Sequence, residues 1–392
     1  MLPIGLSGAD RRAYLDTLTV PHEVRWRVKL LDLEHNLVED LSDMVVDHPE
    51  VNWSVVDQEV RSAAQVTLAD PSRSLGFTTA APARGQVHTN RMLYVKHGTY
   101  VPALGDWVDV PVFCGRVVRP VRDDVLMTLE CHGKERIASR DAWTTRNWPA
   151  RSKKTDLIRR LLTDVAGDAN KKVQIPDWNK RTADEVNVGR GTDPWGLAQK
   201  LARSMDAQLF YDARGVARLR RYPRRVSFTF TDGANRPRRE VEGQQVGATL
   251  ASRPVVSFDT TAEFVNTVWV TGRPARAGAQ RPEAVVRAPA AHPLSAGSNR
   301  RNGVTETRFE RIDDDTIRWF SEANEVAESR MDRILTDYVD VEADSALVTL
   351  LEPGDLCAVA TTEVHQRFRL REFAMSGGRM QVRLRRRGRR SR

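Results

Sequence analysis

The chain has 392 residues, of which 40% are hydrophobic and 29% are charged, and its formal net charge at pH 7 is +9. This length exceeds the roughly 250 to 300 residues that one hydrophobic core organises, so we expect several domains. No apolar run approaches the roughly 20 residues that cross a bilayer. The N-terminal segment also lacks the basic and apolar regions of a secretory signal. We therefore expect a protein that is made and kept in a cytoplasm.

The first third of the chain reads as β-structure. Between residues 20 and 140, apolar and polar side chains alternate with a period of two, which is typical of strands with one buried face. Strands are expected at residues 24–30, 51–55, 64–68, 91–95, 107–118 and 125–131. Residues 70–90, rich in Ala, Pro, Ser and Thr, are expected as a long loop. The pattern predicts an antiparallel barrel or sandwich.

A helical segment follows and ends in a short hairpin. A first helix is expected at residues 155–166, with Gly167 as its C-cap. A second helix starts at the cap Asp193 and at Pro194. It is followed by a strand at residues 208–211, a turn that ends at Gly215, and a returning strand at residues 216–220. The apolar face of this helix consists of Trp195, Ala198, Leu201, Ala202 and Met205. This order predicts a compact α/β domain.

The remainder returns to β-structure around one more helix. Strands are expected at residues 226–230, 246–250 and 267–271, and an exposed excursion rich in Pro, Gly, Ala and Arg at about residues 272–306. A helix is expected at about residues 321–337, with Ser321 as its cap. The Gly354-Asp355 turn before an apolar strand resembles Gly105-Asp106 in the first domain, which suggests a second barrel.

Several segments together carry a resemblance to a known family. In chain order they are HEVRWRVKLLDLEHN, VRSAAQVTLADPSRSL, FCGRVVRP, the helix-and-hairpin DPWGLAQKLARSMDAQLFYDARGVARLRRYP, VNTVWVTGR and LEPGDLCAVATTEV. Over roughly residues 20–386 the chain resembles the minor tail or baseplate-hub (tail-tip) proteins of long-tailed phages. It departs from that pattern at Cys131-His132-Gly133-Lys134, where the family usually has an acidic turn, and in the Arg-rich segment near residues 272–303.

The resemblance implies a mainly β, multidomain fold in which two β-barrel-like hub domains flank a small α/β insertion. We expect a first hub domain at residues 1–145, the α/β domain at 146–228, and a second hub domain at 229–392 that contains the excursion and the helix.

The resemblance also implies a function. It predicts a structural virion protein of the tail tip that is assembled in the host cytoplasm. Three copies would form a ring in which the two barrels of each subunit alternate, and this ring would join the tail tube to the tip and give DNA a passage on ejection. The implied partners are the distal tail protein, the tape-measure protein and tail-tip or fibre proteins.

No enzyme signature is present in the sequence. The chain lacks His-Glu-x-x-His, a phosphate-binding loop and Gly-x-Ser-x-Gly, so we expect no enzyme and assign no catalytic, cofactor or metal residues. Three isolated cysteines, Cys114, Cys131 and Cys357, are expected as buried apolar side chains. The acidic run Asp313-Asp314-Asp315 is expected as a solvated loop rather than a cation site.

The positive charge leaves one alternative open, a basic nucleic-acid-binding protein. Arginines cluster between Arg218 and Arg225 and again between Arg383 and Arg392. Neither cluster alternates with aromatic residues that would stack on bases, so we expect the first to be a solvated or partner-contacting surface and the second to be a frayed end.

Overall fold

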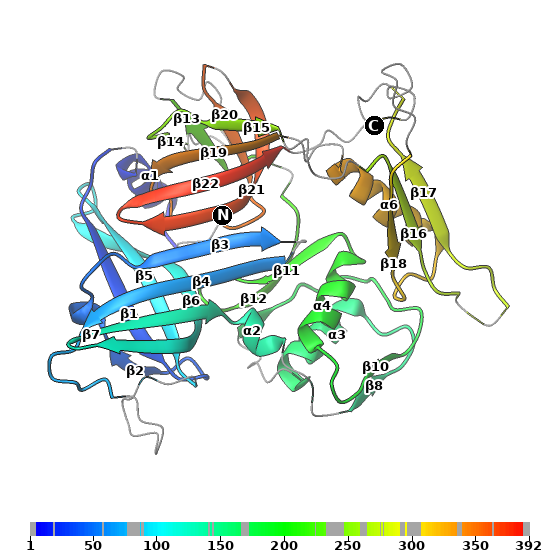
Figure 1. Ribbon diagram of the computed structural model, residues 1–392, viewed down its shortest axis with the longest axis horizontal. Coiled ribbons are helices and arrows are strands. Elements are labelled where there is room, and N and C mark those ends of the chain that lie inside the picture. The colour runs from blue at the N-terminus through cyan, green and yellow to red at the C-terminus, as the bar shows by residue number, and fades with distance from the viewer. Residues whose placement is uncertain are drawn as a thin grey trace.

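The computed structural model describes residues 5–18, 20–56, 59–76, 87, 90–139, 142, 145–165, 172–223, 225–232, 247–258, 265–274, 276, 278–290, 295, 307–334, 339–362 and 364–386. Over these residues the chain is mainly β and multidomain, as predicted (Figure 1). None of the described helices has the length and apolar character needed to span a membrane.

The first barrel consists of antiparallel strands, and two of its neighbouring pairs join strands that are not consecutive in the chain. Its strands are β1 (Val24–Leu31), β2 (Leu37–Asp40), β3 (Glu50–Val56), β4 (Glu59–Ala69), β5 (Met92–Val101), β6 (Asp106–Asp123) and β7 (Leu126–Gly133). They are hydrogen-bonded in the order β3-β4-β7-β6-β5-β1-β2. The segment after β2, with the 3-10 turn η1 (Ser42–Met44), closes the barrel. Here Leu41 N–H donates to the Val28 carbonyl at 2.8 Å and Val46 N–H to the Thr67 carbonyl at 3.1 Å.

The second barrel is assembled from two distant parts of the chain. Its strands are β13 (Phe228–Thr231), β14 (Gly247–Thr249), β15 (Val255–Phe258), β19 (Val339–Ala346), β20 (Leu356–Ala360), β21 (His365–Ser376) and β22 (Arg379–Arg386). Strand β13 pairs in parallel with β14 and β20, and the remaining pairs are antiparallel. A bridge between Leu250 and Ser345 joins the end of β14 to β19.

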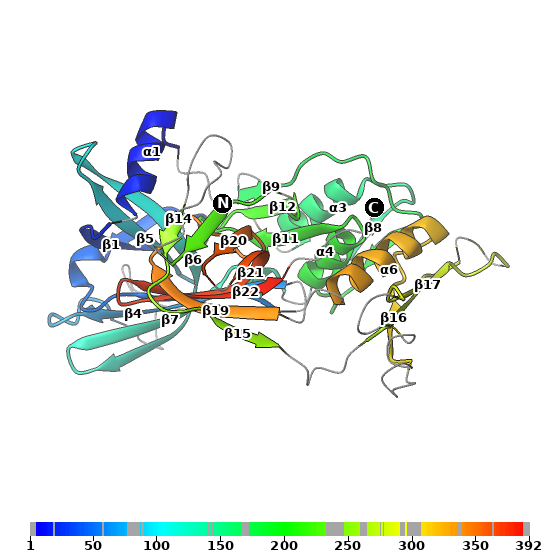
Figure 2. The same ribbon diagram turned by 90° about the horizontal axis from the view of Figure 1, so that it is seen from above.

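The two barrels are joined edge to edge. Strand β21 pairs with β3 over residues 372–375, so one sheet runs from the second barrel into the first (Figure 1). Trp53 and Phe373 stack across this junction with ring centroids 6.2 Å apart. Helix α1 (Gly8–Thr17), which stands on the barrels in Figure 2, adds a hydrogen bond of 3.0 Å between Tyr14 Oη and Thr349 Oγ1. The barrels therefore share one hydrophobic core.

The α/β domain has a core of its own and lies beside the first barrel (Figures 1 and 2). Its elements are α2 (Glu135–Ala138), β8 (Arg146–Trp148), α3 (Lys154–Arg160), the π-helical turn η2 (Leu161–Val165), β9 (Val173–Gln174), β10 (Val186–Val188), α4 (Pro194–Arg203), β11 (Ala207–Tyr211) and β12 (Ala217–Arg221). Asp193 accepts a hydrogen bond from Trp195 N–H at 3.0 Å, which confirms the predicted cap of α4. The predicted apolar face of α4 is buried, and Gly215 has φ +71° in the hairpin turn. The predicted C-cap Gly167 lies outside the described residues.

Between β15 and β19 the chain forms another small α/β unit, which we call the inserted unit (residues 265–334). It consists of β16 (Thr267–Thr271), β17 (Glu283–Arg287), β18 (Phe309–Asp313) and α6 (Phe320–Ile334), in the strand order β17-β16-β18. Val268, Val270, Ala323, Ala327 and Met331 form much of its core. Strand β17 lies in the segment predicted as an exposed excursion, and α6 in the segment predicted as a helix. The division of the chain at residues 145 and 228 stays a prediction.

The expectation of a frayed basic end is wrong where the structure describes it. Arg383, Arg385 and Arg386 belong to β22, which pairs with β19 and β21. Arg385 binds the buried Asp340 through two hydrogen bonds of 2.7 and 2.9 Å. The rest of this cluster, residues 387–392, lies outside the described residues.

Candidate functional site

The junction between the first barrel and the α/β domain centres on the turn of the β11–β12 hairpin. Lys134, at the end of β7, is 4% exposed, and its Nζ donates to the Gly215 carbonyl at 3.1 Å. His35 Nε2 lies 3.2 Å from the same ammonium group, and the Tyr211 ring centroid 5.1 Å from it. Lys134, in the four-residue segment where the sequence departs from the pattern it resembles, therefore links the first barrel to the β11–β12 hairpin.

A second junction joins the same hairpin to the second barrel through charged groups. Arg220 lies 3.0 Å from Glu352 and 3.2 Å from Asp355, and Arg218 lies 3.3 Å from Glu352. Both acids are buried, as is Asp212, which pairs with Arg214 at 3.0 Å. The prediction that Arg218 and Arg220 form a solvated or partner-contacting surface is thus wrong, because their charge is matched within the chain.

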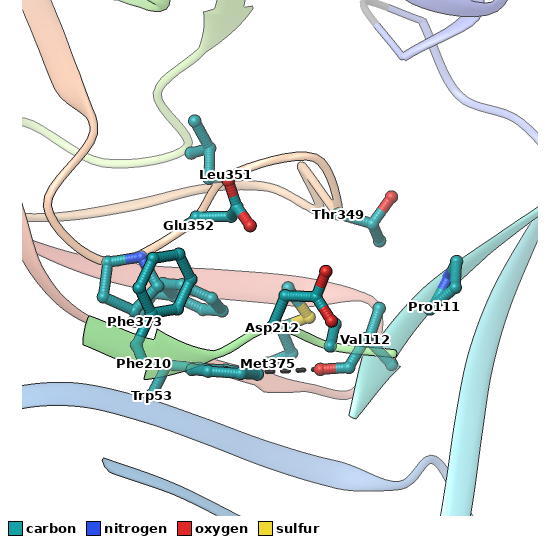
Figure 3. Close-up of a pocket in the computed structure, with 12 residues that line it drawn as sticks. Trp53, Pro111, Val112, Phe210, Asp212, Thr349, Leu351, Glu352, Phe373 and Met375 are labelled. Atoms are coloured by element: carbon teal, nitrogen blue, oxygen red, sulfur yellow. Dashed lines mark hydrogen bonds between the residues drawn. The ribbon is translucent and has the colours of Figure 1, made fainter. Parts of the chain in front are cut away.

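A small cavity lies where the three domains meet. Trp53, Phe210, Thr349, Phe373 and Met375 line it together with acidic groups of the second junction (Figure 3). Trp53 Nε1 donates to the Val112 carbonyl at 3.0 Å, the contact drawn dashed in Figure 3. The cavity offers about 10 Å³ of space to a water-sized sphere, roughly the least that one ordered water needs, so it is a seam between the domains rather than a ligand pocket.

Several titratable side chains in the described part of the chain are buried. Burial lowers the pKa of His97 to about 3 and raises that of Glu135 to about 7. Burial also raises the pKa of the Cys131 and Cys357 thiols, and all three cysteines are buried thiols outside any disulfide, as the sequence predicted. Among the described residues, no group of three or more His, Cys, Asp and Glu side chains is placed to hold a metal ion.

The acidic run lies at the end of β18. Asp313 pairs with Arg311 at 3.0 Å and with Arg281 at 3.2 Å, and it also bonds the Thr271 hydroxyl. These contacts hold the carboxylate of Asp313 in its charged form and lower its pKa; the hydroxyl of Thr271 contributes most. Asp314 accepts from the N–H and the hydroxyl of Thr316. These contacts organise the turn that leads to α6.

The sheet that joins the barrels carries an uncharged row on its outer side. Registered partners across β4, β3, β21 and β22 are Ala63, Asn52, Ala374 and Gln381. All four are exposed or half-buried. The adjoining row carries both signs of charge, and its register partners are, in order across the four strands, Arg61, Ser54, Glu372 and Arg383. This surface spans both barrels and combines an uncharged row with a row that carries charges of both signs.

Neither the comparison with family models nor that with curated proteins finds a match to this chain. Solved structures do match. A 43 kDa tail protein of prophage MuSo2 from Shewanella oneidensis matches with a TM-score of 0.57 at 11% identity, over 92% of this chain and 98% of that one. A tail protein from Neisseria meningitidis matches with a TM-score of 0.57 at 12% identity, over 92% and 96% of the two chains.

A prophage tail protein from Listeria monocytogenes matches with a TM-score of 0.52 at 12% identity, over 92% of this chain and 94% of that one. Each similarity extends over nearly the whole of both chains, barrels and α/β regions together. The fold implied by the sequence resemblance is confirmed: this chain has the fold of phage tail proteins.

Proposed function

We propose that the chain is a non-enzymatic structural component of a phage tail tip or baseplate hub. The observation that carries the proposal is the full-length match to three tail proteins, which leaves little of the chain outside the shared fold. The virion would contain the protein at its tail tip after assembly in the host cytoplasm. Its partners would be the distal tail protein, the tape-measure protein and tail-tip or fibre proteins.

In this proposal three copies form a ring. Each subunit contributes two barrels that already lie side by side in one sheet through the β3–β21 pairing, so three subunits present six barrels. Such a ring matches a hexameric tail tube on one side and a trimeric tip on the other. Analytical ultracentrifugation of the purified chain should give three times the 44.2 kDa of one subunit. A single species of monomer mass would contradict the ring.

The ring would also give DNA a passage during ejection. A passage must not bind phosphates strongly, and the row of Ala63, Asn52, Ala374 and Gln381 suits a wall that DNA slides along. The paired state of Arg218 and Arg220 likewise favours a structural role over nucleic-acid binding. Random DNA should therefore bind weakly at physiological salt. An affinity that is strong and falls steeply with salt would favour the nucleic-acid-binding alternative.

A further inference from the structure

The inserted unit leaves and rejoins the second barrel at one place. Strand β15 ends at Phe258, strand β19 begins at Val339, and these two residues are register partners in the antiparallel β15–β19 ladder. An insertion whose two ends are adjacent is attached at a single point, so rotation about that point does not disturb the barrel. In Figures 1 and 2 the inserted unit lies at the end of the molecule away from the first barrel.

The inserted unit has its own hydrophobic core. Helix α6 packs on β16 and β17 through Ala323, Ala327 and Met331, and the half-buried residues around this core also come from the unit itself. The hydrophobic clusters of the inserted unit and of the α/β domain remain separate among the described residues. The unit therefore keeps its packing whether or not it touches the α/β domain.

Polar groups make the contact between the inserted unit and the α/β domain. The Arg318 guanidinium, 8% exposed, forms an ion pair with Asp184. The Lys154 ammonium group lies 3.7 Å from Glu322. Ser329 Oγ donates to Asp206 Oδ1 at 3.2 Å. We call these three contacts the latch.

Each cation of the latch also has a neutral partner on its own side of the contact. Arg318 donates to the Pro274 carbonyl at 2.9 Å, and Lys154 donates to Ser204 Oγ at 2.9 Å. Separation would thus return both cations to water while each keeps one hydrogen bond. Contacts between domains of one chain that are small and polar are typically weak enough to open.

We propose that the inserted unit is a latched arm: it pivots on the adjacent ends of β15 and β19, and the latch holds it against the α/β domain. The arm carries the exposed aromatic side chains of Phe309, Trp319 and Phe320, so its movement repositions an apolar surface. This inference depends on where the unit is inserted in the β15–β19 ladder and on the latch contacts. It does not depend on the proposed tail-tip function.

The test measures the distance between the arm and the α/β domain. Spin labels are attached to cysteines introduced at Glu283 in β17 and Lys200 in α4, both exposed, while the three native cysteines are buried. The latch variant, Asp184→Asn with Glu322→Gln, removes the two carboxylates that form the ion pairs with Arg318 and Lys154. The control variant, Glu185→Gln with Glu325→Gln, removes two exposed carboxylates from the same two segments, with the same change in net charge.

At low salt the unsubstituted and control proteins should give one narrow distance distribution. The latch variant should give a broader distribution shifted to longer distances, and a salt concentration of about 1 M NaCl should move the unsubstituted protein in the same direction. The salt experiment needs no latch substitution, so it tests the latch even if the variant misfolds. A distribution unchanged by the substitutions and by salt, or one already broad at low salt, would overturn the proposal.

Discussion

The ammonium group of Lys134 lies 3.1 Å from the carbonyl oxygen of Gly215, a residue 81 positions further along the chain. Gly215 suits this close approach for two reasons. Its φ of +71° favours glycine, and a Cβ there would lie 2.8 Å from Cys114 Sγ and 2.9 Å from His35 Cε1. The hairpin turn of the α/β domain thus packs so closely against the first barrel that a side chain at position 215 has no room.

Replacing Gly215 with alanine should therefore destabilise the protein by about 2 kcal/mol or more, from backbone strain and overpacking together. Gly105→Ala is the matched control, because Gly105 has φ +64° and a Cβ added there would meet nothing within 4 Å. It should cost only about 1 kcal/mol. Denaturant unfolding of the two variants measures the difference, and equal losses would show that the close contact at Gly215 is unimportant.

Replacing an arginine of the charged junction with the second barrel should destabilise the protein more than replacing an exposed arginine nearby. Arg220→Met removes the cation that the buried Glu352 and Asp355 share and leaves Glu352 with Arg218; removal of one partner from a buried ion pair costs about 3–5 kcal/mol. Arg221→Met, next in sequence and exposed over the Trp178 ring, should cost less than about 1 kcal/mol. Similar unfolding midpoints for the two variants would contradict the assigned role of Arg220.

The cap of α4 should contribute measurably to the α/β domain. Asp193→Ala removes the acceptor of the Trp195 N–H hydrogen bond at the start of the helix, which should cost about 1 kcal/mol. Asp193→Asn keeps an acceptor oxygen and should recover most of that loss. Thermal unfolding of both variants provides the measurement, and an equal loss for Ala and Asn would exclude capping as the cause.

The buried side chains of His97 and Glu135 should have opposite effects on the way the free energy of unfolding depends on pH. The pKa of His97 is lower in the folded than in the unfolded protein. Above about pH 6.5 His97 is neutral in both states and does not change the free energy of unfolding, whereas that free energy falls as the pH is lowered from about 6.5 toward 3. The pKa of folded Glu135 is raised to about 7, so its stabilising effect is complete below about pH 4.5 and is lost as the pH rises through 7.

Separate variants should expose the two effects. His97→Phe should become more stable as the pH is lowered from about 7.5 to about 5, because Glu135 then dominates. Glu135→Gln should become less stable over the same range, because His97 then dominates, and burial depresses the pKa of His132 in the same direction. Urea unfolding at each pH reports these slopes. If the free energy of unfolding changed with pH in the same way in both variants, the burial of His97 and Glu135 would not be the cause of the pH dependence.

Local patterns in the sequence predicted much of the fold. The spacing of Trp195, Ala198 and Leu201 predicted the buried face of α4, and the alternation in residues 20–140 predicted the first barrel, because both patterns depend on neighbours along the chain. Strand β17 was missed, since its five residues lie in a segment whose Pro, Gly and Arg content is typical of loops.

Contacts between distant parts of the chain were not predictable in this way. Arg220 meets Glu352 and Asp355 across 132 and 135 residues, and no local pattern distinguishes it from a solvated arginine. Lys134 stood out only as a departure from the family pattern, and its role became evident when the fold placed it beside Gly215. Buried pairing of charges is a property of the tertiary structure rather than of sequence spacing.

The most direct test of the proposed function is immunogold labelling of tailed particles from a culture that produces this chain. The tail-tip proposal predicts gold at the distal end of the tail, where the tube meets the tip. Tailed particles without label, with the protein left in the soluble fraction, would contradict it.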